Sequence, residues 1–307
     1  MDRENYRMAS RFPPKKWPLG SSLITLMFVL LVPGITFAHG VIGNRVFLSP
    51  IVGNDAFPDN AVSLTARESD YEFSLLPQFE KQLTDSSSLL FTGGWAQINR
   101  GARRQRKTAG STDLSIWFRQ AAYKSARHEL QVTVSPFLVL PIGDRRIPDQ
   151  GYTHLGGEML LGKGFGDLPD SPSLKYLRPL AVQAETGYAG RIQGPANSDL
   201  FGNFEVEYSL RYLDNFVERV HLARPLVDLV PFVQFNYAQS LLAPRLTTKP
   251  DFRLTPGIAY QNDYGQVSVG AQLALNGAAA SGDRAAVIGL VELYYDDIFP
   301  VLGWNPL

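Results

Sequence analysis

The sequence predicts an all-β fold, a transmembrane antiparallel up-and-down β-barrel of about 12 strands (10–12). From about residue 59 onward, runs of roughly 8 to 14 residues alternate apolar and polar side chains, and each run is followed by a turn or loop. The composition, with 27 Gly, 21 Pro, 18 Phe, 13 Tyr and 4 Trp, suits many strands and turns better than a helical bundle. After the N-terminus, no segment is apolar for long enough to span a bilayer as a helix.

The N-terminus, residues 1–38, is typical of a cleavable signal peptide. A basic stretch up to Lys16 precedes an apolar core at 19–32, and small side chains precede His39. Cleavage after Ala38 is the simplest interpretation. The alternative is an uncleaved anchor helix, but the apolar core is shorter than the roughly 20 residues that a bilayer span needs.

The clearest alternation lies at 203–212. Phe204, Val206, Tyr208, Leu210 and Tyr212 share one predicted face, and Asn203, Glu205, Glu207, Ser209 and Arg211 share the other. A helix would distribute both sets around its circumference. A soluble periplasmic β-sandwich also alternates, but its strands are usually about five or six residues long. The longer runs here, with aromatic residues at the ends of the apolar faces, favour a membrane barrel in the bacterial outer membrane.

The lengths of the links give each strand a direction. With the last strand, about 285–299, ending in the periplasm, the expected outer links are 99–110, 142–151, 189–202, 240–251 and 276–283. The expected periplasmic links are 81–88, 124–128, 165–176, 213–226 and 261–265. Two of these, 165–176 and 213–226, are long for periplasmic turns. Eleven strands follow residue 69 in this count, and the run at 59–66 supplies a twelfth.

The polar faces identify candidate lumen-facing residues. These are Arg119, His154, Glu158, Glu185, Glu205, Glu207, Arg211 and Arg253. An isolated charge in the wall costs several kcal/mol, so these side chains must pair with each other or meet water. An open pore and a plugged interior both satisfy that requirement. The segment before the first strand, at 39–58, is too irregular for a strand and is expected in the periplasm or folded into the lumen.

No motif for catalysis, metal binding or cofactor binding stands out. The four histidines, His39, His128, His154 and His221, lack metal-ligand spacing, although His39 as a mature N-terminus could chelate copper. His154 and Glu158 share one face, which a membrane hydrolase could use and an ordinary polar lumen also explains. The glycine-rich segment 162–166 lacks the glycine spacing of a dinucleotide-binding fingerprint. We therefore expect no enzyme activity, no cofactor and no metal.

Charge and cysteine content exclude further classes. The chain has 29 basic and 29 acidic side chains, and removal of the signal peptide leaves a slight acidic excess, which does not suit nucleic-acid binding. With no cysteine, disulfides, thiolate metal sites and a Cys nucleophile are excluded. A basic run in an expected outer loop could contact lipopolysaccharide phosphates or be an ordinary solvated loop; it comprises Arg100, Arg103, Arg104, Arg106 and Lys107.

Several segments resemble the outer-membrane barrel proteins grouped under the meta-pathway of phenol degradation. The resemblance is carried by 38–40 with 43–47, 162–171, 176–179 and 295–300, and it extends over essentially the whole mature chain. It implies an outer-membrane barrel that transports small aromatic or apolar compounds, with no catalytic motif. Such barrels usually end on an aromatic residue, whereas this chain ends in Leu307.

The expected organisation is a signal peptide (1–38), an irregular segment (39–58), the barrel (59–299) and a C-terminal tail (300–307). Phe299 is the expected strand-terminal aromatic residue, with Val291, Leu293 and Tyr295 on the same closing strand. The expected function is a passive pore or transporter for small solutes; the alternative is a structural or ligand-binding barrel. Expected partners are outer-membrane lipid, lipopolysaccharide, the barrel-assembly machinery and a small-molecule solute.

Overall fold

A computed structural model of the chain describes residues 40–100, 106–193, 197–242 and 249–298. All of these residues belong to one compact unit, Ile35–Leu307. The predicted signal peptide, His39, Phe299 and the tail at 300–307 lie outside the described residues, as do Arg103 and Arg104 of the basic run.

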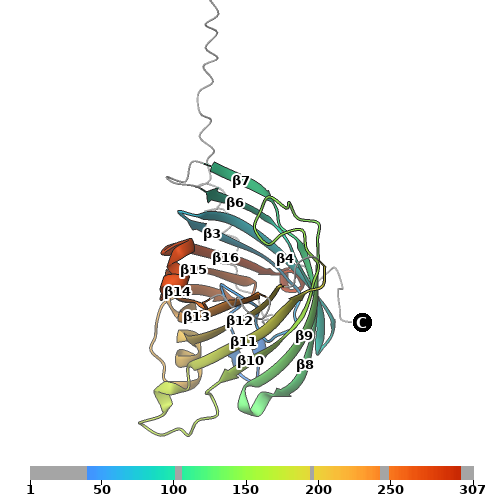
Figure 1. Cartoon of the computed structure of the whole chain (residues 1–307). Coiled ribbons are helices and arrows are strands. Elements are labelled where there is room, and N and C mark those ends of the chain that lie inside the picture. The colour runs from blue at the N-terminus through green and yellow to red at the C-terminus, as the bar shows by residue number, and fades with distance from the viewer. Residues whose placement is uncertain (1–39, 101–105, 194–196, 243–248, 299–307) are drawn as a thin grey trace, which may run out of the picture. The chain divides into compact units, whose positions relative to one another are not determined.

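The described residues form one continuous antiparallel sheet (Figure 1). Its strands are β3 (Ala61–Ser69), β4 (Glu72–Thr84), β5 (Ser87–Thr92), β6 (Trp95–Arg100), β7 (Arg106–Ser111), β8 (Leu114–Ser125), β9 (Leu130–Leu140), β10 (His154–Gly164), β11 (Leu180–Arg191), β12 (Asn197–Tyr208), β13 (Leu229–Leu242), β14 (Asp251–Asn262), β15 (Gly265–Ala274) and β16 (Ala285–Tyr294). A separate hairpin pairs β1 (Val41–Ile42) with β2 (Arg45–Val46).

The sheet closes into a barrel because the last strand pairs with the first. β16 runs antiparallel to β3, from Tyr294 opposite Ala61 to Ala286 opposite Ser69. β5 and β6 are successive parts of one strand, since both pair with β4. β8 pairs with β5 and β7 with β6, so β7 and β8 are likewise successive parts of the next strand. The break between β5 and β6 falls at Gly94, where a Cβ atom would lie 2.1 Å from the backbone oxygen of Leu75. The predicted twelve-stranded antiparallel barrel is confirmed for the described residues.

Short helices occupy the links and follow the last strand. They are η2 (Ala126–His128), η3 (Lys175–Leu177), α2 (Leu210–Tyr212), η4 (Leu213–Val217), η5 (Leu226–Asp228), α3 (Gly277–Gly282) and α4 (Tyr295–Ile298). Within the described ranges, no helix combines the length and the apolar character needed to cross a bilayer.

Because neighbouring strands are antiparallel, the links gather at two ends of the barrel. We name as the turn end the one formed by 85–86, 126–129, 165–179, 209–228 and 263–264, and as the loop end the one that includes 70–71, 141–153 and 275–284. The long links 165–179 and 209–228 therefore lie at the same end as the tight turns, as the strand count requires.

Two predicted strands end earlier than the alternation indicates. β12 stops at Tyr208, because the Ser209 hydroxyl accepts a hydrogen bond from the Tyr212 backbone nitrogen (3.1 Å) and starts α2. Tyr212 is therefore buried instead of lying on the outer face. The prediction that the final strand runs through Tyr295 is also wrong, because β16 ends at Tyr294 and α4 follows.

Candidate functional site

Residues 40–60, here called the plug, fill the turn-end half of the lumen. Figure 1 shows the beginning of this segment, in blue, inside the wall of strands. Gly43 lies against link 126–129, residues 52–54 reach the middle of the wall, and Asn60 returns to the turn end, where its side-chain oxygen accepts a hydrogen bond from Lys81 (3.1 Å). The segment expected to be irregular thus includes the β1–β2 hairpin and lies in the lumen.

Inward-facing glutamines hold the plug backbone. Gln266 accepts a hydrogen bond from the Ser49 nitrogen (3.0 Å) and donates one to the Ser49 oxygen (2.8 Å). Gln234 makes the same pair of contacts with Val52. Three more glutamines donate to plug carbonyl oxygens: Gln131 to Ala56, Gln183 to Leu48 and Gln261 to Phe47. A side-chain amide both donates and accepts, so it can replace a neighbouring strand for a peptide that has none.

Apolar plug residues pack into apolar parts of the wall. Phe47 and Phe57 stack with ring centroids 4.5 Å apart, and both are almost fully buried. Gly162 of β10 makes room for Phe57, since a Cβ atom there would lie 2.4 Å from the ring. Leu48 and Ile51 join a second buried cluster with Val230, Phe232, Ala259, Ile288 and Leu290. Each such side chain contributes about 1.5–3 kcal/mol by leaving water.

Arg119 of β8 anchors the plug by an ion pair. Its guanidinium contacts Glu80 of β4 and the Asp55 carboxylate of the plug, the latter at 2.5 Å, and also donates to the Asp55 backbone oxygen at 2.6 Å. Arg119 is 1% exposed. The inward Arg119 therefore meets a carboxylate on each side, one from the wall and one from the plug.

Glu158 and Glu185 bind the plug at Asn54, near the middle of the wall. The Asn54 side chain donates to Glu158 (3.1 Å), and the Asn54 backbone nitrogen donates to Glu185 (3.4 Å). Gly53 has a φ of +91°, and a Cβ atom there would lie 2.1 Å from the Glu185 carboxylate. Only glycine fits this conformation so close to the wall.

Glu205 and Glu207 face inward from β12 and are buried. Glu207 accepts a hydrogen bond from the Leu48 backbone nitrogen (3.0 Å). Oε1 of Glu205 and Oε1 of Glu207 have no hydrogen-bond partner among the described residues. Phe204, the residue before Glu205, faces outward and is 45% exposed.

Arg45 ties the plug to the long links of the turn end. It donates to Glu129 (3.0 Å) and to the backbone oxygens of Pro179 (2.9 Å) and Arg178, and it lies 4.3 Å from the centre of the Tyr212 ring. The Tyr212 hydroxyl donates to the same Glu129 (3.0 Å). Links 126–129, 165–179 and 209–228 thus meet around one plug side chain, which gives their length a structural role.

Of the predicted lumen residues, Arg211 lies elsewhere than the alternation indicates, whereas Arg253 keeps the inward side of its strand, opposite buried Asn236. Arg211 is not on a lumen strand but in α2, where it pairs with Asp228 (2.7 Å) and Asp263 (2.9 Å) at the turn end. Arg253 lies at the loop end of β14 and pairs with Asp251 (3.0 Å) and Asp283. Arg211 joins two links to each other, and Arg253 joins β14 to the link 275–284.

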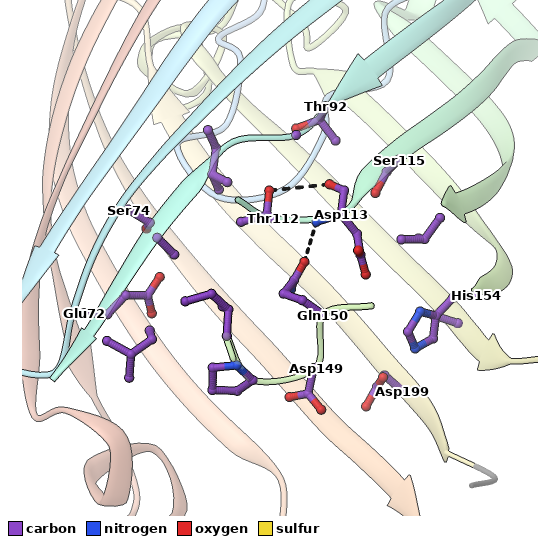
Figure 2. A pocket seen from close by; sticks show the side chains of 18 of the residues that line it. Glu72, Ser74, Thr92, Thr112, Asp113, Ser115, Asp149, Gln150, His154 and Asp199 are labelled. Atoms are coloured by element: carbon purple, nitrogen blue, oxygen red, sulfur yellow. Dashed lines mark hydrogen bonds between the residues drawn. The ribbon is translucent and has the colours of Figure 1, made fainter. Parts of the chain in front are cut away.

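The loop-end half of the lumen holds a cavity of about 690 Å³, here called the vestibule. Its polar lining includes Glu72, Ser74, Asp113, Ser115, His154 and Asp199 (Figure 2). Figure 2 shows Glu72 and Ser74 on one side of the cavity and His154 and Asp199 on the other. Apolar lining comes from Ile98, Val139 and Ile147, among others.

Asp113 positions link 141–153 over the vestibule. Its carboxylate accepts hydrogen bonds from the backbone nitrogens of Gly143 (2.7 Å) and Gly151 (2.9 Å), and its own backbone nitrogen donates to Gln150 (Figure 2). Ile147 of the same link packs on Ala96 and Ile98. The link is therefore a packed wall of the cavity.

His154 lines the vestibule and does not form a pair with Glu158. His154 is 8% exposed, and no hydrogen bond joins its imidazole to another described residue, whereas Glu158 is engaged by the plug. The hydrolase arrangement considered for this pair has no support in that geometry. In the described part of the chain, no three His, Asp or Glu side chains gather as metal ligands would.

Carboxylates in the loop-end links titrate below their ordinary range. Burial raises the pKa of Asp283, but hydrogen bonds from Arg67 and Arg253 outweigh it, so the pKa is lowered. Hydrogen bonds from Arg146 lower the pKa of partly exposed Asp144 to about 2. Both carboxylates remain charged at neutral pH; Asp283 holds arginines of two strands, and Asp144 holds Arg146 of its own link.

Arg45, Asp113 and the inward glutamines were not among the residues that the sequence pattern predicted for the lumen. The glutamines had a usable signal, because Gln131, Gln183 and Gln266 lie on the polar faces of strongly alternating runs. Arg45 and Asp113 lie outside such runs, so no period marks them.

Comparisons with known proteins give distant structural similarities. No family model matches the chain, and no curated protein does. An outer membrane channel from Pseudomonas putida F1 is similar with 10% identity over 80% of this chain and 99% of that chain, at a TM-score of 0.49. The NanC porin (9% identity, 76% and 98% covered, TM-score 0.43) and LpxR from Salmonella typhimurium (10%, 76% and 100%, 0.43) are also similar. These similarities are too distant to assign an activity to this chain.

Proposed function

We propose that the chain is an outer-membrane channel for small solutes, which enter through the vestibule and pass when the plug shifts. The observation that carries this proposal is the unfilled vestibule of about 690 Å³ above a plug that closes the lumen. A volume of this size falls within the roughly 300–1,000 Å³ of small-molecule sites.

The distribution of side chains across the wall supports a membrane location. Large apolar side chains are exposed on the outside of many strands, including Leu64, Phe118, Met159, Phe204, Val233, Val269 and Val287. The buried lumen side carries many charged, amide and hydroxyl groups. This arrangement is the reverse of a soluble protein and suits lipid outside and a polar lumen inside. Barrels of this kind belong to the bacterial outer membrane.

The plug makes the channel gated rather than permanently open. Its backbone bonds to the wall, and buried Phe47 and Phe57 keep it in the turn-end half. A solute of vestibule size therefore needs the plug to move. Loosening the two phenylalanines should raise the fraction of time for which the channel conducts.

Single-channel recording in planar bilayers tests the proposal. The wild-type protein should give small or rare current steps, and a Phe47→Ala/Phe57→Ala variant several-fold larger or more frequent steps. Phe204→Ala, which removes an outward ring, is the matched control and should behave as wild type. Absence of current from both the wild type and the plug variant would contradict the channel.

The second candidate is a ligand-binding barrel without transport. The many hydrogen bonds between plug and wall favour it, because they suit a permanently closed lumen. A folded plug variant that passes no current while the vestibule still binds small molecules would support this candidate.

The finer predictions from the sequence belong to the same proposal. The resemblance to the phenol meta-pathway family implies aromatic or apolar solutes, and the apolar vestibule lining is compatible with them. Contacts with lipopolysaccharide and the barrel-assembly machinery, and the absence of enzyme activity, stay predictions.

A further inference from the structure

The charged groups that line the vestibule have one sign. Among its described lining residues, the carboxylates are Glu72, Asp113, Asp149 and Asp199, the remaining ionisable groups are His154 and Tyr71, and no Lys or Arg belongs to the lining. A cavity lined by one sign of charge within a protein wall attracts the opposite charge, because the low-dielectric wall focuses the field into it.

Two of these carboxylates have basic partners and two do not. Glu72 lies 3.3 Å from Arg67, and Asp149 lies 3.7 Å from Arg191. Asp113 accepts only from backbone N–H groups in the described structure, and there Asp199 accepts from the Ser240 hydroxyl (2.6 Å). Neutral donors stabilise a carboxylate but leave its charge uncompensated. The vestibule therefore keeps two uncompensated negative charges.

His154 independently indicates that the vestibule can bind a ligand. Its imidazole is more than nine-tenths buried and lines the vestibule, and within the described ranges no side chain or backbone group bonds to it. In the described structure the imidazole thus lacks a hydrogen-bond partner. A solute in the vestibule can supply that partner, because a neutral imidazole both accepts and donates.

The rest of the lining calls for an apolar body. Ile98, Val139, Ile147 and Pro148 line the cavity together with the Tyr71 ring. Among the described lining residues, a carboxylate or phosphate solute would find apolar surface and negative charge but no Lys or Arg. A protonated amine would find acceptors beside an apolar wall.

We infer that the vestibule selects small organic cations, a protonated amine on an apolar or aromatic body, with Asp199 and Asp113 attracting the ammonium and His154 completing its hydrogen bonds. This inference deepens the proposed function and rests on it in taking the vestibule as the entrance for the solute. It adds a charge preference to the aromatic or apolar class.

Binding to the refolded barrel in detergent tests the charge preference without any current. The probes are benzylammonium, benzyl alcohol and benzoate, which share a ring and differ in charge, and titration calorimetry measures each dissociation constant. Benzylammonium should bind at least about tenfold more tightly than benzoate, as expected for two nearby carboxylates. Equal or tighter binding of benzoate would overturn the inference.

Variants locate the site. Asp199→Asn keeps an acceptor for Ser240 and should weaken benzylammonium binding about fivefold while leaving benzyl alcohol unchanged. Asp144→Asn is the matched control, because Asp144 pairs with Arg146 and does not line the vestibule. His154→Ala should weaken both probes. An equal effect of the Asp199 and Asp144 changes would overturn the assignment.

The outcomes separate this inference from the channel. If benzylammonium binds in a way that depends on Asp199 but the plug variant passes no current, the channel proposal is contradicted and the charge preference is supported. If the channel conducts but benzylammonium neither binds nor reduces the current, the charge preference is contradicted and the channel proposal is supported.

Discussion

The two halves of the lumen share one wall but are built on different chemistry. In the turn-end half, inward glutamines bond to both polar groups of a peptide, and the plug fills the space. In the loop-end half, carboxylates and hydroxyls alternate with apolar side chains around an unfilled cavity. Amide side chains substitute for a missing strand, whereas carboxylates only accept. Paired amide contacts therefore distinguish the half that binds the chain itself, whereas inward carboxylates occur in both halves.

The largest expected effect comes from Arg119 in the filled half. Arg119→Met leaves Glu80 and Asp55 buried without their cation, which should cost about 3–5 kcal/mol of unfolding free energy. Urea unfolding in lipid vesicles, followed by heat-modifiable gel mobility, measures it. In the vestibule, His154→Ala should leave stability nearly unchanged. Similar losses from both changes would erase the contrast between the halves.

Adjacent residues of β12 test which side of the wall meets lipid. Phe204→Arg places a charge on the outer face and should cost about 2–4 kcal/mol if residue 204 lies near the midplane. Glu205→Gln should be neutral or stabilising, because it removes a buried charge whose Oε1 has no described partner. The same vesicle unfolding assay compares them. A stabilising Phe204→Arg would reverse the facing.

A pair of glycines on β10 tests the fit of the plug. Gly162→Val puts a side chain into the Phe57 ring, and overpacking of this kind should cost about 1–3 kcal/mol. Gly157→Val on the opposite face has room, since a Cβ atom there would lie 3.8 Å from its nearest neighbours. Thermal loss of the folded gel band distinguishes the two. Equal thermal stability of the variants would mean that the plug does not press on β10.

The glutamine contacts are expected to contribute less individually. Gln266→Leu leaves the Ser49 nitrogen and oxygen without their wall partner and should cost about 1–2 kcal/mol. Gln150→Leu removes the vestibule glutamine and should cost less. Hydrogen exchange at Ser49 should rise in the first variant only, and unchanged exchange there would argue against a wall-held backbone.

The smallest effect is a pH dependence at the loop end. The pKa of Asp283 is lowered in the folded protein, so its contribution is present above the unfolded value of about 4 and is lost as pH falls through the folded pKa. Asp283→Asn should therefore destabilise the barrel at pH 7 and have little effect near pH 2. Unfolding midpoints at both pH values measure this, and a larger effect at the acidic pH would reverse the expected sign.

The sequence by itself determined the wall. Alternation is a local property with a period of two, so runs such as 203–208 specify strand, facing and, through the links, a total of twelve strands. The ends of strands were less predictable. At Ser209 a single side-chain cap overrides an alternation that continues to Tyr212.

Only the tertiary structure decided what fills the lumen. The contacts of Leu48 with Glu207 and of Ser49 with Gln266 join residues 159 and 217 positions apart, and no periodic pattern relates them. The vestibule likewise depends on how Asp113 fixes a link from elsewhere in the chain. An inward carboxylate has the same sequence signature whether it holds a plug, as Glu158 does, or faces a cavity, as Asp199 does. Whether a carboxylate meets the plug or the cavity is decided only when the barrel closes around the plug.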